Sequence, residues 1–270
     1  MVPLLKSFAR QILPERVTVA ARVLFRRLPI AYSGRYSSYA AAARHATGYA
    51  DPVIFETTRK AALAVKRGEA AFEHGGVARR TPNYSWAALT SLQHAAITGH
   101  ASPQRPLHVV DFGGSLGALY FKNRRFLEAI PLLWSIVEQP HYVACGNAEF
   151  ADARLAFFSS IAEAAARAPV DAILFASSLE YSGAPYDLLT EAAALRPAFI
   201  IITGTHLSDG AEDEFRVQRL YAPLHPASLA MRYVSKRKLI EHMAAIGYGP
   251  IAAFDQGYLL QRKPEIGEPA

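Results

Sequence analysis

The chain has 270 residues, of which 51% are hydrophobic and 19% are charged. This length and composition predict a packed globular core in one large domain, or in a domain with a smaller appendage. The one cysteine, Cys145, excludes an internal disulfide and a Cys-based zinc cluster, and it suits a reducing compartment such as the cytoplasm. The nine histidines show no metal-ligand spacing, so we predict no metal site.

The net charge of +6 is concentrated at the N-terminus. Residues 1–30 hold six Lys and Arg residues against one acid, and the rest of the chain is close to neutral. A basic patch confined to one terminal arm argues against a nucleic-acid enzyme, whose basic surface would flank the catalytic cleft. The apolar runs of the arm are too short and interrupted for a membrane span or a signal peptide. The arm could lie on an anionic membrane, or it could be a solvated basic helix packed on the domain.

Residues 1–105 are expected to be mostly helical. A polar, aromatic loop over residues 32–39 precedes an alanine-rich helix, and further helices are predicted at about 53–66 and 85–98. Strands and helices do not alternate in this part of the sequence. We therefore interpret residues 1–105 as a basic arm followed by a helical N-terminal extension.

From residue 106 the pattern changes to a regular alternation of apolar strands and helices. This spacing predicts a parallel, doubly wound sheet, and two final strands joined across Asp255-Gln256-Gly257 suggest a hairpin at the sheet edge. We assign residues 106–263 to this domain and expect residues 264–270 to be disordered. The predicted strands are 107–111, 133–137, 155–158, 171–176, 198–203, 250–254 and 257–262, and the predicted helices are 116–129, 160–167, 186–195 and 235–246.

The most informative stretch is the strand over residues 107–110, which ends in Asp111 and a glycine-rich turn. Glycine brings bare backbone close to a ligand, and such a turn points the first N–H groups of a helix into the crevice at the strand end. The turn lacks the P-loop pattern, and its spacing differs from the dinucleotide fingerprint. Glu138 ends the second strand 27 residues after Asp111, where doubly wound folds hold a ribose through its hydroxyls. The alternative is a plain strand–helix–strand unit with an acid at a strand end.

Several sequence blocks together resemble one protein family. Asp-Phe-Gly-Gly-Ser-Leu-Gly at 111–117 and Val-Glu-Gln at 137–139 are the most specific of them. Further blocks lie at 34–38, 48–49, 65–69 and 177–181. Taken together in this order, the blocks are similar to a family of bacterial S-adenosylmethionine (SAM)-dependent methyltransferases often associated with surface-polysaccharide synthesis. The resemblance spans roughly residues 32–260. It implies a class I methyltransferase-like, Rossmann-like sheet and S-adenosyl-L-methionine as the cofactor.

The resemblance also implies a cofactor site at the carboxyl ends of the strands. The glycine-rich turn would line the methionine half of SAM, with Asp111 facing the methionine ammonium directly or through water. Glu138 would accept both ribose hydroxyls, and Gln139 would border the adenine. Ser159 and Ser160 could instead be helix N-caps, and Phe158 could be ordinary core. The implied cofactor residues are Asp111, Gly113, Gly114, Ser115, Gly117, Glu138, Gln139, Phe158, Ser159 and Ser177.

The methyl acceptor is expected beyond the ends of the fourth and fifth strands. A hydroxyl acceptor benefits from a base within hydrogen-bond reach. His206 is the first candidate for that base, because it follows the fifth strand and its ordinary pKa is near neutrality. Glu180 is the second candidate and Asp209 the third. Where the family tends to have Asp-Arg-Thr-Pro, this chain has Thr203-Gly204-Thr205-His206, which puts shared chemistry in doubt.

The segment between the fifth strand and the last helix lies where such folds often shape the acceptor pocket. Arg216 and Arg219 are three residues apart on a predicted helix, where they could hold a phosphate or carboxylate. They could equally form a solvated face paired with Glu212 and Asp213. Residues 221–226 read as a turn-rich insert.

The sequence therefore predicts a SAM-dependent methyltransferase that methylates an oxygen of a sugar or sugar-lipid intermediate in the cytoplasm. The acceptor rests on family association alone. One alternative is a catalytically inactive methyltransferase-fold protein that acts as a binding or scaffold subunit at the inner membrane surface through residues 1–30. Another is nucleotide-sugar or NAD chemistry on a Rossmann-like sheet.

Overall fold

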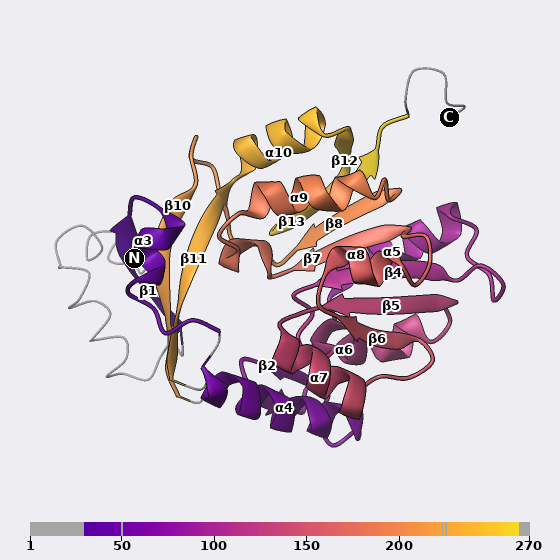
Figure 1. Ribbon diagram of the computed structural model, residues 1–270, viewed down its shortest axis with the longest axis horizontal. Coiled ribbons are helices and arrows are strands. Elements are labelled where there is room, and N and C mark those ends of the chain that lie inside the picture. The colour runs from indigo at the N-terminus through magenta and orange to yellow at the C-terminus, as the bar shows by residue number, and fades with distance from the viewer. Residues whose placement is uncertain (1–29, 50, 223, 225, 265–270) are drawn as a thin grey trace, which may run out of the picture.

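The central sheet of the computed structural model has seven strands in the order β12-β13-β8-β7-β4-β5-β6. Strands β4 to β8 run parallel, and the β12–β13 hairpin is antiparallel to β8 at one edge (Figure 1). The predicted doubly wound, class I methyltransferase-like sheet with its edge hairpin is thus confirmed. Its strands are β4 (Leu107–Phe112), β5 (Leu132–Val137), β6 (Leu155–Phe158), β7 (Ala172–Ala176), β8 (Phe199–Thr203), β12 (Tyr248–Phe254) and β13 (Gly257–Arg262).

The structure describes residues 30–49, 51–222, 224 and 226–264. The basic arm and most of the C-terminal tail lie outside these residues. A membrane contact through the arm and disorder of the tail therefore stay predictions. No helix in the described part of the chain is both long and apolar enough to cross a membrane.

Helices cover both faces of the central sheet. Successive residues of a strand point to opposite faces, so an apolar strand presents apolar side chains to the helices on each side. On one face α5, α6 and α7 pack over Val109 and Leu174. On the other face α8, α9 and α10 pack over Val110 and Ile173. Both faces of these strands are apolar, as buried parallel strands require. The helices are α5 (Trp86–Thr98), α6 (Ala118–Leu127), α7 (Pro140–Glu149), α8 (Ile161–Ala165), α9 (Pro185–Ala194) and α10 (Lys236–Ala245).

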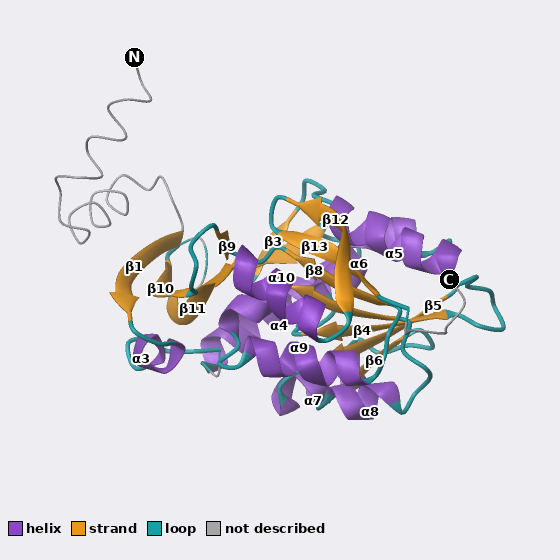
Figure 2. Cartoon of the chain, turned by 90° about the horizontal axis from the view of Figure 1, so that it is seen from above, coloured by secondary structure: helices purple, strands orange, loops and turns teal. Residues whose placement is uncertain are grey.

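A second sheet, absent from the sequence prediction, has the order β1-β10-β11-β9. Strand β1 pairs antiparallel with β10, so segments far apart in the sequence lie side by side. Strands β10 and β11 form a hairpin, and β9 runs parallel to β11. Figures 1 and 2 place this sheet beyond the carboxyl ends of the parallel strands. Its strands are β1 (Ile30–Tyr36), β9 (Leu207–Ser208), β10 (Glu214–Leu220) and β11 (Ala227–Ser235).

The second sheet corrects the prediction of a helix around Arg216 and Arg219, because both residues lie in β10. Their spacing resembles one face of a helix, but the segment pairs with a strand on each side. The successive side chains of Val217 and Gln218 are both buried, so burial does not alternate along the strand.

Residues 1–105 are expected to be mostly helical, but the part that the structure describes also contains three strands. The expected loop at 32–39 is largely strand β1, and the Gly75-Gly76 break joins a hairpin of β2 (Phe72–His74) and β3 (Val77–Arg79). The helices here are α3 (Tyr39–Ala43), α4 (Pro52–Lys66) and α5. Strand β1 is rich in Tyr, Ser and Gly and is stabilised by its distant partner β10, which its own sequence does not indicate.

Helix α7 is a further element that the sequence did not predict. It starts with Pro140 in its first turn, where the missing N–H costs no hydrogen bond. Its small residues give no clear helical spacing of apolar side chains. Gly146 allows close packing on β6, because a Cβ there would lie 2.4 Å from the ring of Phe157.

A buried ion pair fixes the second sheet to helix α9. The Arg232 guanidinium lies 2.7 Å from the Asp213 carboxylate, and the two side chains are only 8% and 4% exposed. Asp213 also accepts hydrogen bonds from the Tyr186 hydroxyl at 2.8 Å and the Ser235 N–H at 2.9 Å. Both oxygens of the Asp213 carboxylate thus accept hydrogen bonds, as a buried charge requires.

Asp213→Asn is expected to lower the free energy of unfolding by about 3–5 kcal/mol, because it leaves the Arg232 charge buried without its partner. Urea denaturation measures this loss. Glu212→Gln is the matched control, since Glu212 pairs with Lys238 on the surface with side chains 72% and 43% exposed. Its effect should stay within about 0.5 kcal/mol. Equal losses in the two variants would contradict the role of the buried pair.

Candidate cofactor and acceptor site

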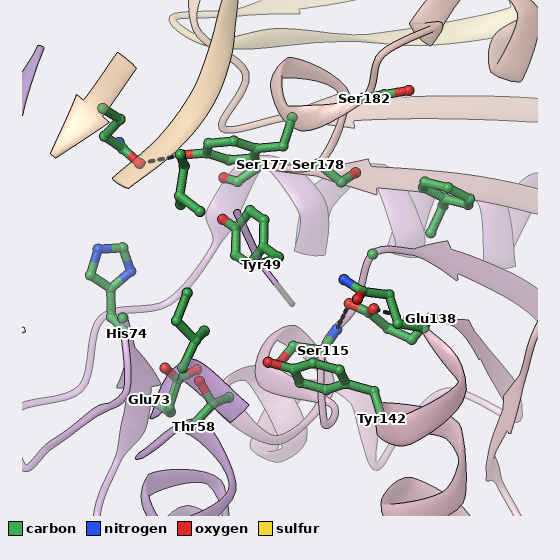
Figure 3. Close-up of a pocket in the computed structure, with 18 of the residues that line it drawn as sticks. Tyr49, Thr58, Glu73, His74, Ser115, Glu138, Tyr142, Ser177, Ser178 and Ser182 are labelled. Atoms are coloured by element: carbon green, nitrogen blue, oxygen red, sulfur yellow. Dashed lines mark hydrogen bonds between the residues drawn. The ribbon is translucent and has the colours of Figure 1, made fainter. Parts of the chain in front are cut away.

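A cavity of about 610 Å³ opens between the carboxyl ends of the parallel strands and the second sheet (Figure 3). This volume lies in the range of roughly 300–1,000 Å³ that small-molecule sites occupy. One side is formed by the turns after β4, β5, β6 and β7. The opposite side is formed by α4, the β2–β3 hairpin and the second sheet. The residues of the strand-end side include Phe112, Gly113, Ser115, Val137, Glu138, Gln139, Pro140, Ser159, Ser177 and Ser178.

The glycine-rich turn between β4 and α6 has the backbone that its sequence predicted. Gly113 has φ +74°, and a Cβ there would lie 2.7 Å from the Cβ of Ser178. Ser115 also has a positive φ, 54°, which is strained for a residue with a side chain. The turn therefore lies directly against the segment after β7 and exposes backbone to the cavity.

Glu138 lies at the end of β5 with its carboxylate at the cavity wall (Figure 3). One oxygen accepts the Ser115 N–H at 3.1 Å, and the other accepts the Gln139 N–H at 2.9 Å. Burial raises the pKa of Glu138, while these two hydrogen bonds favour its charged form. Each carboxylate oxygen keeps a further lone pair, so the group can accept two hydroxyls of a ligand.

Asp111 lies beneath the glycine-rich turn and does not line the cavity. Its Oδ2 accepts the Trp134 indole N–H at 3.1 Å, while Oδ1 has no partner among the described residues. Burial raises the pKa of Asp111 to about 7. The Trp134 hydrogen bond opposes this rise, and the charge of Glu138 adds to it. The backbone of Gly114 covers this carboxyl so closely that a Cβ there would lie 2.5 Å from Oδ2.

The other cofactor residues that the sequence singled out divide into two groups. The first group lines the cavity and consists of Gly113, Ser115, Glu138, Gln139, Ser159 and Ser177. The residues that do not line it are Asp111, Gly114, Gly117 and Phe158. Gly117 starts helix α6 at φ +87°, and Phe158 packs on the core of the α8–α10 face. The N-cap of α8 is Ser160, not Ser159.

The three candidate bases are not on the cavity wall. Glu180 is fully buried, and its Oε1 lies 3.3 Å from His206 Nδ1. The other ring nitrogen, Nε2, lies 2.9 Å from the Tyr32 hydroxyl. Asp209 is on the surface, where it pairs with Lys236 at 2.8 Å. The structure thus brings His206 and Glu180 together but places Asp209 apart from them.

A short chain of hydrogen bonds connects His206 to the cavity. The Gln218 amide donates to the Tyr32 hydroxyl at 3.4 Å and accepts from the Tyr181 hydroxyl at 3.0 Å. Gln218 and Tyr181 both line the cavity. Each nitrogen of His206 has a partner, and the imidazole lies behind the cavity wall.

The sequence analysis missed the side of the cavity that faces the strand ends. Five aliphatic side chains form what we call the aliphatic wall, and Glu73, His74, Tyr49 and Tyr142 lie beside it. The helix and the strands that carry them come together only in the folded chain. The Gly75-Gly76 break was the one local signal for the hairpin that carries Glu73. The aliphatic wall consists of Ile30, Ile54, Leu220, Leu224 and Leu229.

Comparison with protein-family models gives no match, and comparison with curated proteins gives none either. Among solved structures, the chain is similar to 1,6-didemethyltoxoflavin-N1-methyltransferase of Burkholderia thailandensis, with 18% identity over 87% of this chain and 95% of that one and a TM-score of 0.41. An amino pentose methyltransferase of Micromonospora echinaspora shares 13% identity over 75% of this chain and 96% of its own, with a TM-score of 0.44. A sugar N-methyltransferase of a Streptoalloteichus species shares 11% identity over 66% of this chain and 88% of its own, with a TM-score of 0.45. These are likenesses between folds, and they assign no cofactor or acceptor to this chain.

Asp111→Asn is expected to change how stability depends on pH. Between about pH 4 and pH 7 the folded state keeps a proton on Asp111 that the unfolded state has lost. In this range the group therefore lowers the unfolding free energy by about 1.4 kcal/mol for each unit that the pH rises. The variant lacks this fall, so it should gain stability relative to the wild type across that range and hold the gain at higher pH. Urea denaturation at several pH values measures the difference. The control Asp187→Asn changes an exposed acid of α9 and leaves the buried Asp111 carboxyl in place, so it should keep the fall seen in the wild type. A constant difference for Asp111→Asn would contradict the raised pKa.

Proposed function

We propose that this chain is a SAM-dependent methyltransferase that acts on a small molecule. The observation that carries the proposal is the cavity in which a bare-backbone turn and the Glu138 carboxylate meet at the strand ends. A carboxylate in this place can hold the two ribose hydroxyls of an adenosyl group. The described lining contains the acids Glu73 and Glu138 and no Lys or Arg, which suits a ligand that carries a positive sulfonium.

The residues at the strand ends fit SAM one by one. Glu138 would hold the ribose, and Gln139 and Ser159 would border the adenine. Gly113, Ser115 and Ser177 would lie along the methionine part, with Asp111 acting through the turn that covers it. When bound, SAM supplies an electrophilic methyl group. Methyl transfer is an in-line displacement, so placing the acceptor correctly supplies much of the acceleration.

The acceptor that we propose is a hydroxyl of a sugar or of a sugar-lipid intermediate in surface-polysaccharide synthesis. The family resemblance supports this choice by analogy. The cavity volume of about 610 Å³ supports a small molecule over a protein or nucleic-acid surface.

The alternative of an inactive scaffold protein rests on the altered Thr203–His206 segment. The structure weakens this argument, because His206 lies behind the cavity wall and both of its nitrogens have partners. A change at this segment therefore removes no side chain from the cavity itself. Membrane attachment through residues 1–30 is compatible with either function and stays a separate proposal.

Glu138→Ala is expected to weaken binding of S-adenosylhomocysteine (SAH) at least tenfold, about 1.4 kcal/mol, because it removes the acceptor of the ribose hydroxyls. Isothermal titration calorimetry measures both affinities. Glu128→Ala is the control, since Glu128 is an exposed acid at the end of α6 and should leave the affinity unchanged. No SAH binding by the wild type would sink the proposal. Thermal protection by NAD or UDP-glucose in place of SAH would favour the Rossmann-like alternative.

Deletion of residues 1–28 is expected to reduce binding to phosphatidylglycerol vesicles, because it removes the six basic residues of the arm. SAH affinity should not change. Co-sedimentation with vesicles measures the effect, and phosphatidylcholine vesicles provide the uncharged control. Equal binding of the full and shortened chains to the anionic vesicles would refute the membrane contact.

A further inference from the structure

One acid of the cavity has no place in the cofactor site. Glu73, near the end of β2, lines the cavity on the side away from the strand ends. Figure 3 shows Glu73 and Glu138 on opposite sides of the drawn site. A carboxyl group in this position faces whatever occupies the part of the cavity that the cofactor leaves open.

The β2–β3 hairpin holds the Glu73 carboxyl in place. Its Oε1 accepts the Gly76 N–H at 2.7 Å. Gly75 and Gly76 have φ values of 59° and 74°, the backbone of a tight two-residue hairpin turn. At Gly75 a Cβ would lie 2.9 Å from a methyl group of Leu224, so the turn packs directly on the aliphatic wall. The acid and the aliphatic wall are therefore built together.

The surroundings of Glu73 suit the charge state of a proton acceptor near neutral pH. Burial raises its pKa to about 7, while the Gly76 hydrogen bond and the Lys122 charge from α6 oppose a larger rise. The described residues give no ion pair between Glu73 and a cation within 4.0 Å. A carboxyl group with a pKa near the working pH is effective in general base catalysis.

Burial shifts the pKa values of two titratable neighbours of Glu73, Tyr142 and His74, in the directions that favour their uncharged forms. Burial raises the pKa of the Tyr142 phenol on α7, and the Glu73 charge adds to this rise. Burial lowers the pKa of His74, with the charges of Lys122 and Arg79 adding to the effect. Helix α4 contributes the uncharged Thr58 to the same part of the cavity.

The aliphatic wall restricts what can bind beside Glu73. Its five side chains have no hydrogen-bonding groups, pack together in one cluster and line the same cavity as this acid. A free sugar presents hydroxyls all round and would lose hydrogen bonds to water against such a surface. An amphiphile would bury its apolar part there and keep its hydroxyl for Glu73.

We propose that Glu73 binds the acceptor hydroxyl and takes its proton, and that the acceptor is an amphiphile whose apolar part lies against the aliphatic wall. This inference rests on the proposed methyltransferase function. The acceptor hydroxyl loses its proton to the Glu73 carboxylate as its oxygen bonds to the methyl carbon, and the electron pair of the broken carbon–sulfur bond stays on sulfur. Of the two acceptors named above, the sugar-lipid meets this description and the free sugar does not.

The test uses the full-length protein saturated with SAH and a probe amphiphile, n-octyl β-D-glucoside below its micelle-forming concentration. Calorimetry at pH 6 and pH 8 compares the wild type, Glu73→Gln and Glu69→Gln. Glutamine keeps an oxygen for the Gly76 N–H. Glu69 is an exposed acid four residues away and is the matched control. Methyl β-D-glucoside, which lacks the alkyl chain, tests the aliphatic wall.

The wild type and Glu69→Gln should bind the octyl probe up to about tenfold more tightly at pH 8 than at pH 6, because a group with a pKa near 7 is mostly ionised only at the higher pH. Glu73→Gln should bind it at least about tenfold more weakly at pH 8 and show no pH dependence, with SAH affinity unchanged. Methyl β-D-glucoside should bind much more weakly than the octyl probe to all three proteins.

Four results would overturn this inference. They are no binding of the octyl probe, binding independent of pH, a pH dependence that persists in Glu73→Gln, and equal affinity for the two glucosides. SAH binding by the wild type would still leave the proposed methyltransferase function standing. A persistent pH dependence would assign the titration to His74 or Glu138. If Glu73→Gln does not fold, the pH dependence and the glucoside comparison in the wild type still decide the question.

Discussion

The cavity depends on one close approach, between the backbone of Gly113 and the side chain of Ser178. A Cβ at Gly113 would lie 2.7 Å from the Cβ of Ser178, so only glycine allows the turn after β4 to lie against the segment after β7. The same turn is tied to β5 by the hydrogen bond from the Gly113 N–H to the Val137 carbonyl at 2.9 Å and by the Ser115 N–H on Glu138. One turn therefore fixes the ends of three strands, and the direction of the Glu138 carboxylate follows from it.

Three carboxyl groups lie at this turn or across the cavity from it, and burial raises the pKa of each. Asp111 lies beneath the turn, while Glu138 and Glu73 lie on opposite sides of the cavity. Burying such groups is costly, and a positively charged ligand would offset part of that cost. A pyrophosphate, in contrast, would place its negative charges among carboxylates, with no Lys or Arg in the described lining to receive them. This argues for an adenosyl sulfonium over NAD or a nucleotide-sugar.

The features that the sequence predicted are those with a local cause. The run over β4 is apolar on both faces, the glycine-rich turn follows it directly, and Glu138 ends the next apolar strand. The second sheet had no such local cause, because β1 is stabilised by β10 from the other end of the described chain. Glu73 was missed for the same reason. The proposed role of Glu73 depends on the aliphatic wall. This wall is assembled from α4, β1, β10, β11 and the turn between β10 and β11.

The second sheet also explains why a residue at a strand end need not reach the site. His206 follows β8, as predicted, but Tyr32 of β1 and Gln218 of β10 lie between its imidazole and the cavity. The buried Glu180 holds the other side of the ring. Since His206 and Glu180 lie off the cavity wall, the acid of the β2–β3 hairpin, which lines the cavity, is the group that we propose to take the proton.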